Sequence, residues 1–112
     1  MTGYERGDVL LALFTYSEET GAKRRPAVVV SNRGFNEHRN EVVAVAVTSN
    51  ITRVLAGDHV ISNWRDAGLE LPSVATGVVR TIGRARIARK LGTLSTLDMD
   101  AIDKNLRAML SL

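Results

Sequence analysis

Short apolar runs, each closed by polar residues, glycine or proline, recur along most of the chain. Runs of this length that are rich in β-branched residues and lack a helical period are typical of buried strands. We therefore expect strands at 8–15, 27–31, 41–48, 59–61, 74–80 and 89–92. Gly77 lies inside the fifth run, which indicates a β-bulge or the close approach of another backbone.

Only the end of the chain has the spacing of a helix. Apolar residues recur there at intervals of three and four, namely Met99, Ile102, Leu106, Met109 and Leu110. The preceding Ser95–Asp98 segment matches a capping box, so we expect the helix to begin there and to pack its apolar stripe on the core. Several short strands followed by one packed helix predict a mainly β fold, a small β-barrel with a C-terminal α-helix.

The stretch 17–26 between the first two expected strands is polar and charged, which predicts a surface loop that ends at Pro26. Arg25 stands directly before this proline, and proline restricts the backbone of the residue that precedes it. A guanidinium positioned in this way is suited to clamping a phosphate. A solvated loop arginine is the alternative, and the residues alone favour it.

Polar side chains of Thr48–Asn50 end the third expected strand, either as ordinary turn residues or as a cluster of hydrogen-bond donors. We interpret His38, in a polar turn, and His59, at a strand start, as structural or surface residues. Trp64 follows an apolar pair and is expected to pack against the end of the barrel, although an exposed tryptophan there could stack on a nucleobase.

Length and composition indicate one globular domain covering residues 1–112. The chain has 112 residues, of which 45% are hydrophobic and 24% charged, as in an average soluble domain. No apolar run approaches the roughly 18 residues that cross a bilayer, and the N-terminus lacks the pattern of a signal peptide. We therefore expect a cytoplasmic protein without membrane contact.

Several kinds of chemistry are excluded by absent residues and motifs. The chain has no cysteine and two histidines, which excludes disulfides, thiolate zinc sites and three-histidine metal sites. The Walker, Rossmann, zinc-helix and nucleophile-elbow motifs are missing. Asp98, Asp100 and Asp103 resemble the start of a calcium loop, but the positions that need glycine and glutamate hold Asp103 and Met109. We expect neither metal nor cofactor, and assign these acids to the positive end of the helix dipole.

Positive charge is concentrated in two parts of the sequence. Fifteen Lys and Arg against 12 Asp and Glu give a net charge of +3, but ten of the cations fall in two blocks. The blocks are Lys23, Arg24, Arg25, Arg33 and Arg39, and Arg80, Arg84, Arg86, Arg89 and Lys90. If folding brings the blocks onto one face, that face suits a polyanion such as nucleic acid or an acidic protein.

Several short motifs, taken together and in order, resemble the MazF/PemK family of endoribonuclease toxins from bacterial type II toxin–antitoxin systems. The motifs are Arg6–Val9, Arg25–Asn32, Phe35–Asn36, Val47–Thr52, Arg80–Ile82 and Lys90–Ser95. The resemblance covers nearly the whole chain, from Arg6 into the final helix. It implies an SH3-like barrel of the CcdB/PemK type with a C-terminal helix, a homodimer, and metal-independent cleavage of single-stranded RNA at a short sequence.

The resemblance also implies which residues act. In this family an arginine before the proline and a threonine at the end of the third strand act on the scissile phosphate, and they match Arg25 and Thr48. We expect further RNA contacts from Lys23, Arg24, Ser49, Asn50, Arg80, Arg84 and Arg86. A guanidinium gives up its proton reluctantly, so the general base has no assigned residue.

The chain departs from the family pattern at three places. Many relatives have an acidic residue and Gln shortly before the Arg-Thr-Ile element, where this chain has Gly77–Val78. Arg33 follows Asn32 where an acid is common, and Glu18–Gly21 replaces the usual Glu-Gln-Gly run. These changes concern the target sequence and the rate more than the fold.

Three functional hypotheses follow. The first is a ribonuclease toxin that uses Arg25 and Thr48 and is silenced by a cognate acidic antitoxin, disordered when free, that binds across the basic blocks. The second is a non-catalytic toxin of the same fold that poisons a protein target such as gyrase. The third is a small basic RNA-binding barrel, but an aromatic content of 4% gives little stacking surface for that role. The matches at Arg25 and Thr48 favour the first hypothesis.

Overall fold

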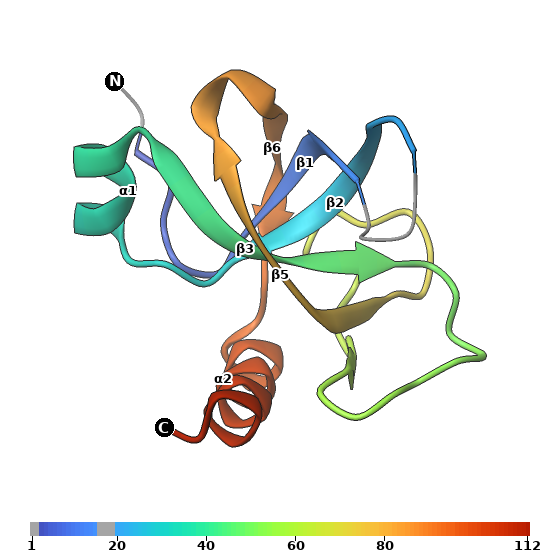
Figure 1. The fold of residues 1–112 in the computed structure, drawn as a ribbon. Helices are drawn as coiled ribbons and strands as arrows, with labels where there is room; N and C mark the ends of the chain where they lie inside the picture. Colours follow the sequence, from blue (N-terminus) through green and yellow to red (C-terminus); the bar gives the residue numbers. More distant parts are fainter. Residues whose placement is uncertain (1–2, 16–19) are drawn as a thin grey trace.

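The computed structural model of the chain describes residues 3–15 and 20–112, and within them six strands form one antiparallel sheet with the order β4-β5-β3-β2-β1-β6 (Figure 1). The strands are β1 (Asp8–Phe14), β2 (Lys23–Val29), β3 (Glu41–Thr48), β4 (His59–Val60), β5 (Val74–Gly83) and β6 (Ile87–Thr93). The helices are α1 (Arg33–Arg39) and α2 (Thr96–Leu110), and a 3-10 turn, η1 (Arg84–Arg86), joins β5 to β6.

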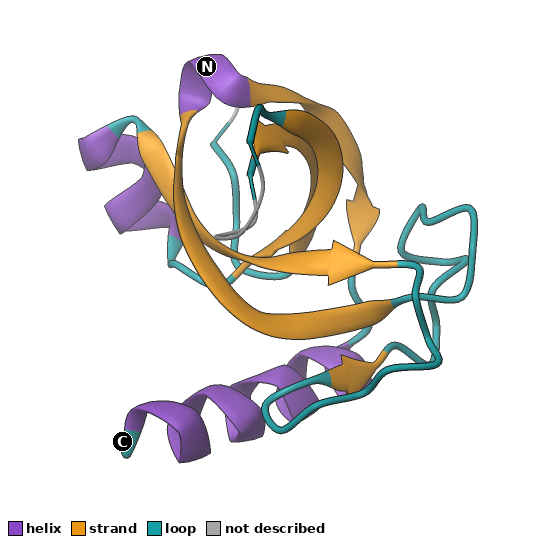
Figure 2. Ribbon diagram, turned by 45° about the vertical axis from the view of Figure 1, so that its right-hand side comes forward, coloured by secondary structure: helices purple, strands orange, loops and turns teal. Residues whose placement is uncertain are grey.

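The sheet curls strongly on itself, and α2 lies outside the curl beside β4 (Figure 2). Side chains alternate between the two faces of each strand, so the described residues form two apolar clusters. Leu10, Ala27 and Ala44 belong to one cluster, and their neighbours Val9 and Val28 belong to the other, which includes residues of α2. The expected small β-barrel with a C-terminal helix is confirmed.

A bulge in β5 surrounds Gly77. Val45 of β3 pairs with Val79 of β5, but Val47 pairs with Ala75, so two steps along β3 correspond to four steps along β5. The extra residues bend β5 around the end of the curl. The bulge expected from the glycine in this run is confirmed.

The second strand begins earlier than its apolar run. Lys23–Pro26, expected in a loop, belong to β2 and pair with β1, with Lys23 opposite Phe14 and Pro26 opposite Leu11. Backbone pairing needs no apolar side chain, and the side chains of Lys23 and Arg24 stay exposed. The ladder to β3 begins only at Ala27, after the proline, which has no N–H to donate. Residues 20–22 of the expected loop belong to no strand or helix, and residues 17–19 lie outside the described residues.

The helix α1 was not expected, because its sequence carries no apolar stripe. The Asn32 side chain caps it by accepting a hydrogen bond of 2.8 Å from Phe35 N. Asn40, with φ at 54°, ends it in the left-handed conformation. His38 therefore lies in a helix, where its Nδ1 contacts the carbonyl oxygen of Gly34 at 2.8 Å.

The helix α2 begins as expected but packs over only part of its length. Ser95 is its N-cap and accepts a hydrogen bond from Asp98 N. Met99 and Ile102 are buried, whereas Met109 and Leu110 are 41% and 54% exposed, so packing of the whole stripe was a wrong expectation. Met109 still reaches the sheet with its sulfur, which would lie 3.3 Å from a side-chain carbon on Gly77 of β5. No helix in the described residues is long and apolar enough to cross a membrane.

Candidate functional site

Arg25 and Thr48 come from adjacent antiparallel strands. The β2–β3 ladder ends with Ala27 opposite Ala46. Continued two residues beyond the end of the ladder, the same register leads to Arg25 and Thr48, and both residues line one cavity. Both residues are half-buried, and the Nε atom of Arg25 is buried. The structure therefore brings the two expected catalytic residues together at one end of the sheet.

An open cavity of about 500 Å³ lies at this end of the sheet. Its lining consists of Leu11, Arg25, Pro26, Val47, Thr48, Ser49, Gly68, Leu69, Glu70, Leu71, Ser73, Arg89 and Leu91. Two guanidiniums, three hydroxyls and one carboxylate thus share the wall with apolar side chains. A cavity of this size, with a few polar groups among apolar ones, is typical of a small-ligand site, and guanidiniums favour a phosphate.

The Thr48–Asn50 segment contains both a turn residue and side chains that face the cavity. Asn50 N donates to Thr48 Oγ1 at 3.2 Å, and Asn50 Oδ1 accepts from the hydroxyl of Thr52 at 2.7 Å, so Asn50 acts as a turn residue. Thr48 and Ser49 instead line the cavity. Because Thr48 Oγ1 accepts from the backbone, its hydroxyl proton can still be donated to a ligand.

One wall of the cavity is the turn between β4 and β5, residues 61–73. Gly68 in this turn has φ at 85°, and a side-chain carbon on it would lie 2.1 Å from the carbonyl oxygen of Leu91 in β6. A side-chain carbon on Gly92 would lie 2.4 Å from the carbonyl oxygen of Ala67. Only glycine allows both approaches. The turn is therefore fixed directly against β6.

Asp98, which is fully buried, holds the other side of the same turn. Its carboxylate accepts hydrogen bonds from Ser62 N at 2.8 Å, Asn63 N at 2.9 Å, His59 Nε2 at 2.8 Å and Ser95 Oγ at 3.0 Å. Burial alone raises the pKa of Asp98, but these hydrogen bonds outweigh it, so the pKa lies below the ordinary value of 3.8. Asp98 thus ties the turn to α2, and the structural interpretation of His59 is confirmed.

The other cations expected to bind RNA do not converge on the cavity. Lys23 and Arg24 are exposed at the start of β2, next to Arg25. Arg80 donates from Nε to the carbonyl oxygen of Thr15 at 3.3 Å. Two more basic residues, Arg84 and Arg86, lie in η1, which follows Gly83 opposite Glu41, the first residue of β3. They lie at the opposite end of β3 from Thr48.

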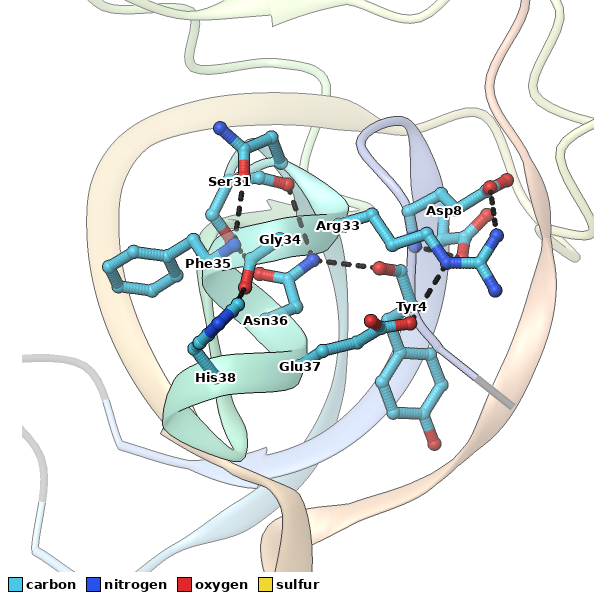
Figure 3. A network of polar contacts seen from close by, with 11 residues as sticks. Tyr4, Asp8, Ser31, Arg33, Gly34, Phe35, Asn36, Glu37 and His38 are labelled. Carbon is cyan, nitrogen blue, oxygen red and sulfur yellow. Dashed lines mark hydrogen bonds and ion pairs between the residues drawn. The ribbon is translucent and has the colours of Figure 1, made fainter. Parts of the chain in front are cut away.

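A polar cluster around α1 fills that opposite end (Figure 3). Asn36 is buried there, its Nδ2 donates to the carbonyl oxygen of Tyr4 at 2.8 Å, and its Oδ1 accepts from Ser31 Oγ. Arg33 pairs with Glu37 at 3.0 Å. These polar groups satisfy one another, which is the behaviour of a structural cluster.

Two charged residues of the cavity were missed by sequence reasoning. Arg89 was counted in the second basic block but was not assigned a contact with RNA, and Glu70 had no assigned role. Nothing in the local sequence marks Glu70, because its place in the cavity depends on the contact between Gly68 and Leu91. Trp64, in the same turn, is half-buried against the core with Arg65 over its ring at 4.9 Å, so its expected packing is confirmed.

Comparison with known proteins places the chain in a family. Residues 5–110 match the model of the PemK-like, MazF-like toxin of type II toxin–antitoxin systems. The chain belongs to this family. Among the residues that the structure describes, this toxin has no group of three or more His, Cys, Asp or Glu that could hold a metal ion.

Solved structures of similar fold cover the toxin almost completely. MazF from Deinococcus radiodurans matches with a TM-score of 0.82 and 21% identity, covering 100% of both chains. An endoribonuclease in complex with its cognate antitoxin, from a mycobacterial species, has a TM-score of 0.78 and 24% identity, covering 97% of this chain and 96% of its own. Mycobacterium tuberculosis toxin MazF-mt6 has a TM-score of 0.77 and 21% identity, with 94% and 97% covered.

Proposed function

We propose that this toxin is a sequence-specific endoribonuclease that cuts single-stranded RNA in the cytoplasm without a metal ion. One observation carries the proposal: Arg25 of β2 and Thr48 of β3 line the same cavity of about 500 Å³. The names of similar structures, which include endoribonucleases, support it.

The proposed reaction uses the ribose hydroxyl next to the scissile phosphate. The 2′-oxygen attacks phosphorus, a 2′-O–P bond forms, and the bond from phosphorus to the 5′-oxygen breaks. The 2′-hydroxyl loses its proton and the departing 5′-oxygen gains one. The products carry a 2′,3′-cyclic phosphate and a 5′-hydroxyl. Charge that develops on the phosphate oxygens in the transition state must be stabilised.

Arg25 and Thr48 supply complementary groups for this reaction. The guanidinium of Arg25 can bind the phosphate with two parallel hydrogen bonds and donate a proton to the departing 5′-oxygen. The Thr48 hydroxyl can donate to a phosphate oxygen. Ser49 and Arg89 line the same cavity and extend its capacity for RNA. Exposed Lys23 and Arg24 increase the local positive potential beside Arg25.

Incubation of the purified toxin with a long single-stranded RNA tests the proposal directly. We expect cleavage at a short sequence to persist in excess EDTA. Kinase labelling without phosphatase treatment should detect the 5′-hydroxyl ends. Cleavage that disappears in EDTA and returns with Mg²⁺ would contradict the proposed mechanism. An intact RNA under all conditions would favour a toxin that binds a protein target instead.

We further propose that an acidic antitoxin segment silences the toxin and that the toxin acts as a homodimer. The charge of Lys23 and Arg24 supports an electrostatic encounter that weakens with salt. Exposed apolar side chains, such as Leu55 at 55% and Val60 at 47%, offer contact area for a second copy. Titration calorimetry with the cognate peptide at low and raised salt, and sedimentation of the toxin alone, test the two points.

A further inference from the structure

We propose that Glu70 is the proton acceptor for the 2′-hydroxyl in this cleavage. The inference rests on the proposed function and supplies the group that the reaction of Arg25 and Thr48 lacks. It depends on where the turn between β4 and β5 places a carboxylate that nothing in the sequence marks.

Glu70 is the one acid in the lining of the cavity that the described residues form. Within that described part of the chain, its side chain makes no hydrogen bond or ion pair, so both carboxylate oxygens are available to a ligand. The two histidines are engaged elsewhere. His59 is bonded to Asp98, and His38 contacts the Gly34 carbonyl in α1.

The backbone around Glu70 is held on both sides. Leu69 is buried, and its N–H donates to the carbonyl oxygen of Trp64 at 3.1 Å. On the other side, Ser73 Oγ donates to the carbonyl oxygen of Leu71 at 2.7 Å. The Gly68 contact fixes the same turn on β6. These contacts fix the backbone that carries the exposed Glu70 side chain at the wall of the cavity.

The charge of Glu70 is unfavourable for RNA binding alone. Arg25 and Arg89 attract a phosphate to the cavity, whereas a carboxylate in the same lining repels it. The negative charge of Glu70 therefore does not help the cavity to bind a phosphate. A carboxylate that accepts the 2′-hydroxyl proton stabilises the transition state, and this stabilisation can outweigh its repulsion of the bound phosphate.

The proposed step is balanced. As the 2′-O–P bond forms, the 2′-hydroxyl proton passes to a carboxylate oxygen of Glu70. The departing 5′-oxygen takes a proton from Arg25, which regains one from water. Glu70 then releases its proton to water, and the enzyme returns to its starting state with no other reactant consumed.

Steady-state cleavage of a short RNA that contains one target site tests this role. Glu70→Gln keeps the size of the side chain and removes its ability to accept the proton. We expect kcat to fall by about a hundredfold to ten-thousandfold, while KM stays equal or decreases because the repulsion is gone. Formate at high concentration should restore part of the activity of Glu70→Ala by replacing the missing carboxylate.

Two controls accompany this variant. Asp66→Asn removes an acid from the same turn at an exposed position outside the cavity lining, and it should leave kcat unchanged. The double variant Glu18→Gln with Glu19→Gln removes the acids of the first loop, which lie outside the described residues. A larger loss of kcat in this double variant than in Glu70→Gln would overturn the assignment.

Other results also decide the question. A kcat of Glu70→Gln within threefold of wild type overturns the inference and leaves the proposed function standing. A change of the cleaved sequence or a raised KM with normal kcat would show that Glu70 contacts a base instead, and also overturns it. If the wild type does not cleave RNA at all, the proposed function and this inference fall together.

Discussion

The two ends of β3 carry similar kinds of polar side chains, but at one end charged side chains pair with one another, whereas at the other end they line an open cavity. At the Glu41 end, Arg39 pairs with Glu41 at 2.7 Å, and Arg33 pairs with Glu5 and Glu37. At the Thr48 end, the side chains of Glu70 and Arg89 make no hydrogen bond or ion pair within the described residues.

The presence or absence of a protein partner distinguishes structural from functional residues better than their charge does. A polar cluster whose members bond to one another stabilises the fold and leaves nothing for a ligand. Charged groups around an open cavity acquire partners when a ligand enters, so they are the candidates for chemistry. The comparison predicts that substitutions of the cavity residues at the Thr48 end reduce activity and that substitutions within the paired cluster at the Glu41 end leave activity unchanged and, for the buried Asn36, reduce stability.

The largest expected effect is the loss of cleavage in Arg25→Ala and Thr48→Ala. Removal of a group that stabilises charge at a reacting phosphate reduces kcat by about a hundredfold to a thousandfold. Arg25→Lys should recover little, because an ammonium cannot reproduce two parallel hydrogen bonds. Single-turnover cleavage measures the effect, and circular dichroism checks the fold.

Arg39→Ala is the matched control at the other end of β3. It removes an arginine that pairs with Glu41 and lies over the Phe35 ring at 5.3 Å. Its cleavage rate should equal that of wild type. Equal losses of activity in Arg25→Ala and Arg39→Ala would erase the distinction between the two ends.

A smaller effect, on stability, is expected from Asp98, which supports the turn beneath the cavity. Asp98→Ala leaves the backbone amides of Ser62 and Asn63 without their acceptor, and should lower the free energy of unfolding by about 3 kcal/mol. Urea denaturation at neutral pH measures this loss. A loss well under 1 kcal/mol would contradict the importance of the network.

The same carboxylate predicts a pH dependence. The pKa of Asp98 is lowered in the folded state, so its contribution to stability is complete above the ordinary value of 3.8 and is lost as pH falls through the lower, folded value. Wild-type stability should therefore decline below about pH 3.8, and Asp98→Asn should show a shallower decline. If the stability of wild type and of Asp98→Asn fell equally with decreasing pH, groups other than Asp98 would cause the acid sensitivity.

The fold was largely predictable from hydrophobic period, because most strands bury one face and the last helix has a capping residue and an apolar stripe. The exceptions have physical causes. The first residues of β2 are exposed and polar, so backbone pairing alone defines them. The helix α1 depends on the Asn32 cap and on buried Asn36, and neither produces a periodic signal. Met109 and Leu110 continue the period of α2 but are 41% and 54% exposed.

The site was predictable only in part. Arg25 and Thr48 were found through the family resemblance, and the residues alone favoured a solvated arginine. That both line one cavity is visible only once the arrangement of β2 and β3 is known. Glu70 and Arg89 are far from both in sequence, and the approach of Gly68 to Leu91 brings their segments together. In the sequence, only two glycines, Gly68 and Gly92, indicate this contact between backbones.

Asn36→Leu tests the Glu41 end and should have a moderate effect on stability alone. The substitution removes the donor to the carbonyl oxygen of Tyr4, which costs about 1–2 kcal/mol, whereas Ser31 Oγ still accepts from Val43 N at 2.9 Å. Cleavage per folded molecule should not change. Thermal unfolding measures the loss of stability, and the cleavage rate divided by the concentration of folded protein measures the activity. A lower rate at equal stability would show that α1 takes part in catalysis.

The smallest expected effect is that of Arg86→Ala, which decides how far RNA extends along β3. Arg86 is exposed in η1, beyond the Glu41 end, and β3 has eight residues, so at about 3.3 Å per residue the two ends are roughly 23 Å apart along the strand. RNA held only in the cavity would not touch Arg86, and neither kcat nor binding would change. RNA that follows β3 would lose one phosphate contact in Arg86→Ala, and the slope of log K against log salt would become shallower by about 0.7 without a change in the cleaved sequence.

We expect this loss of one phosphate contact in Arg86→Ala, with binding weakened by less than about threefold, since a single exposed contact contributes little. A fall in kcat comparable to that of Arg25→Ala would contradict the assignment of chemistry to the Thr48 end.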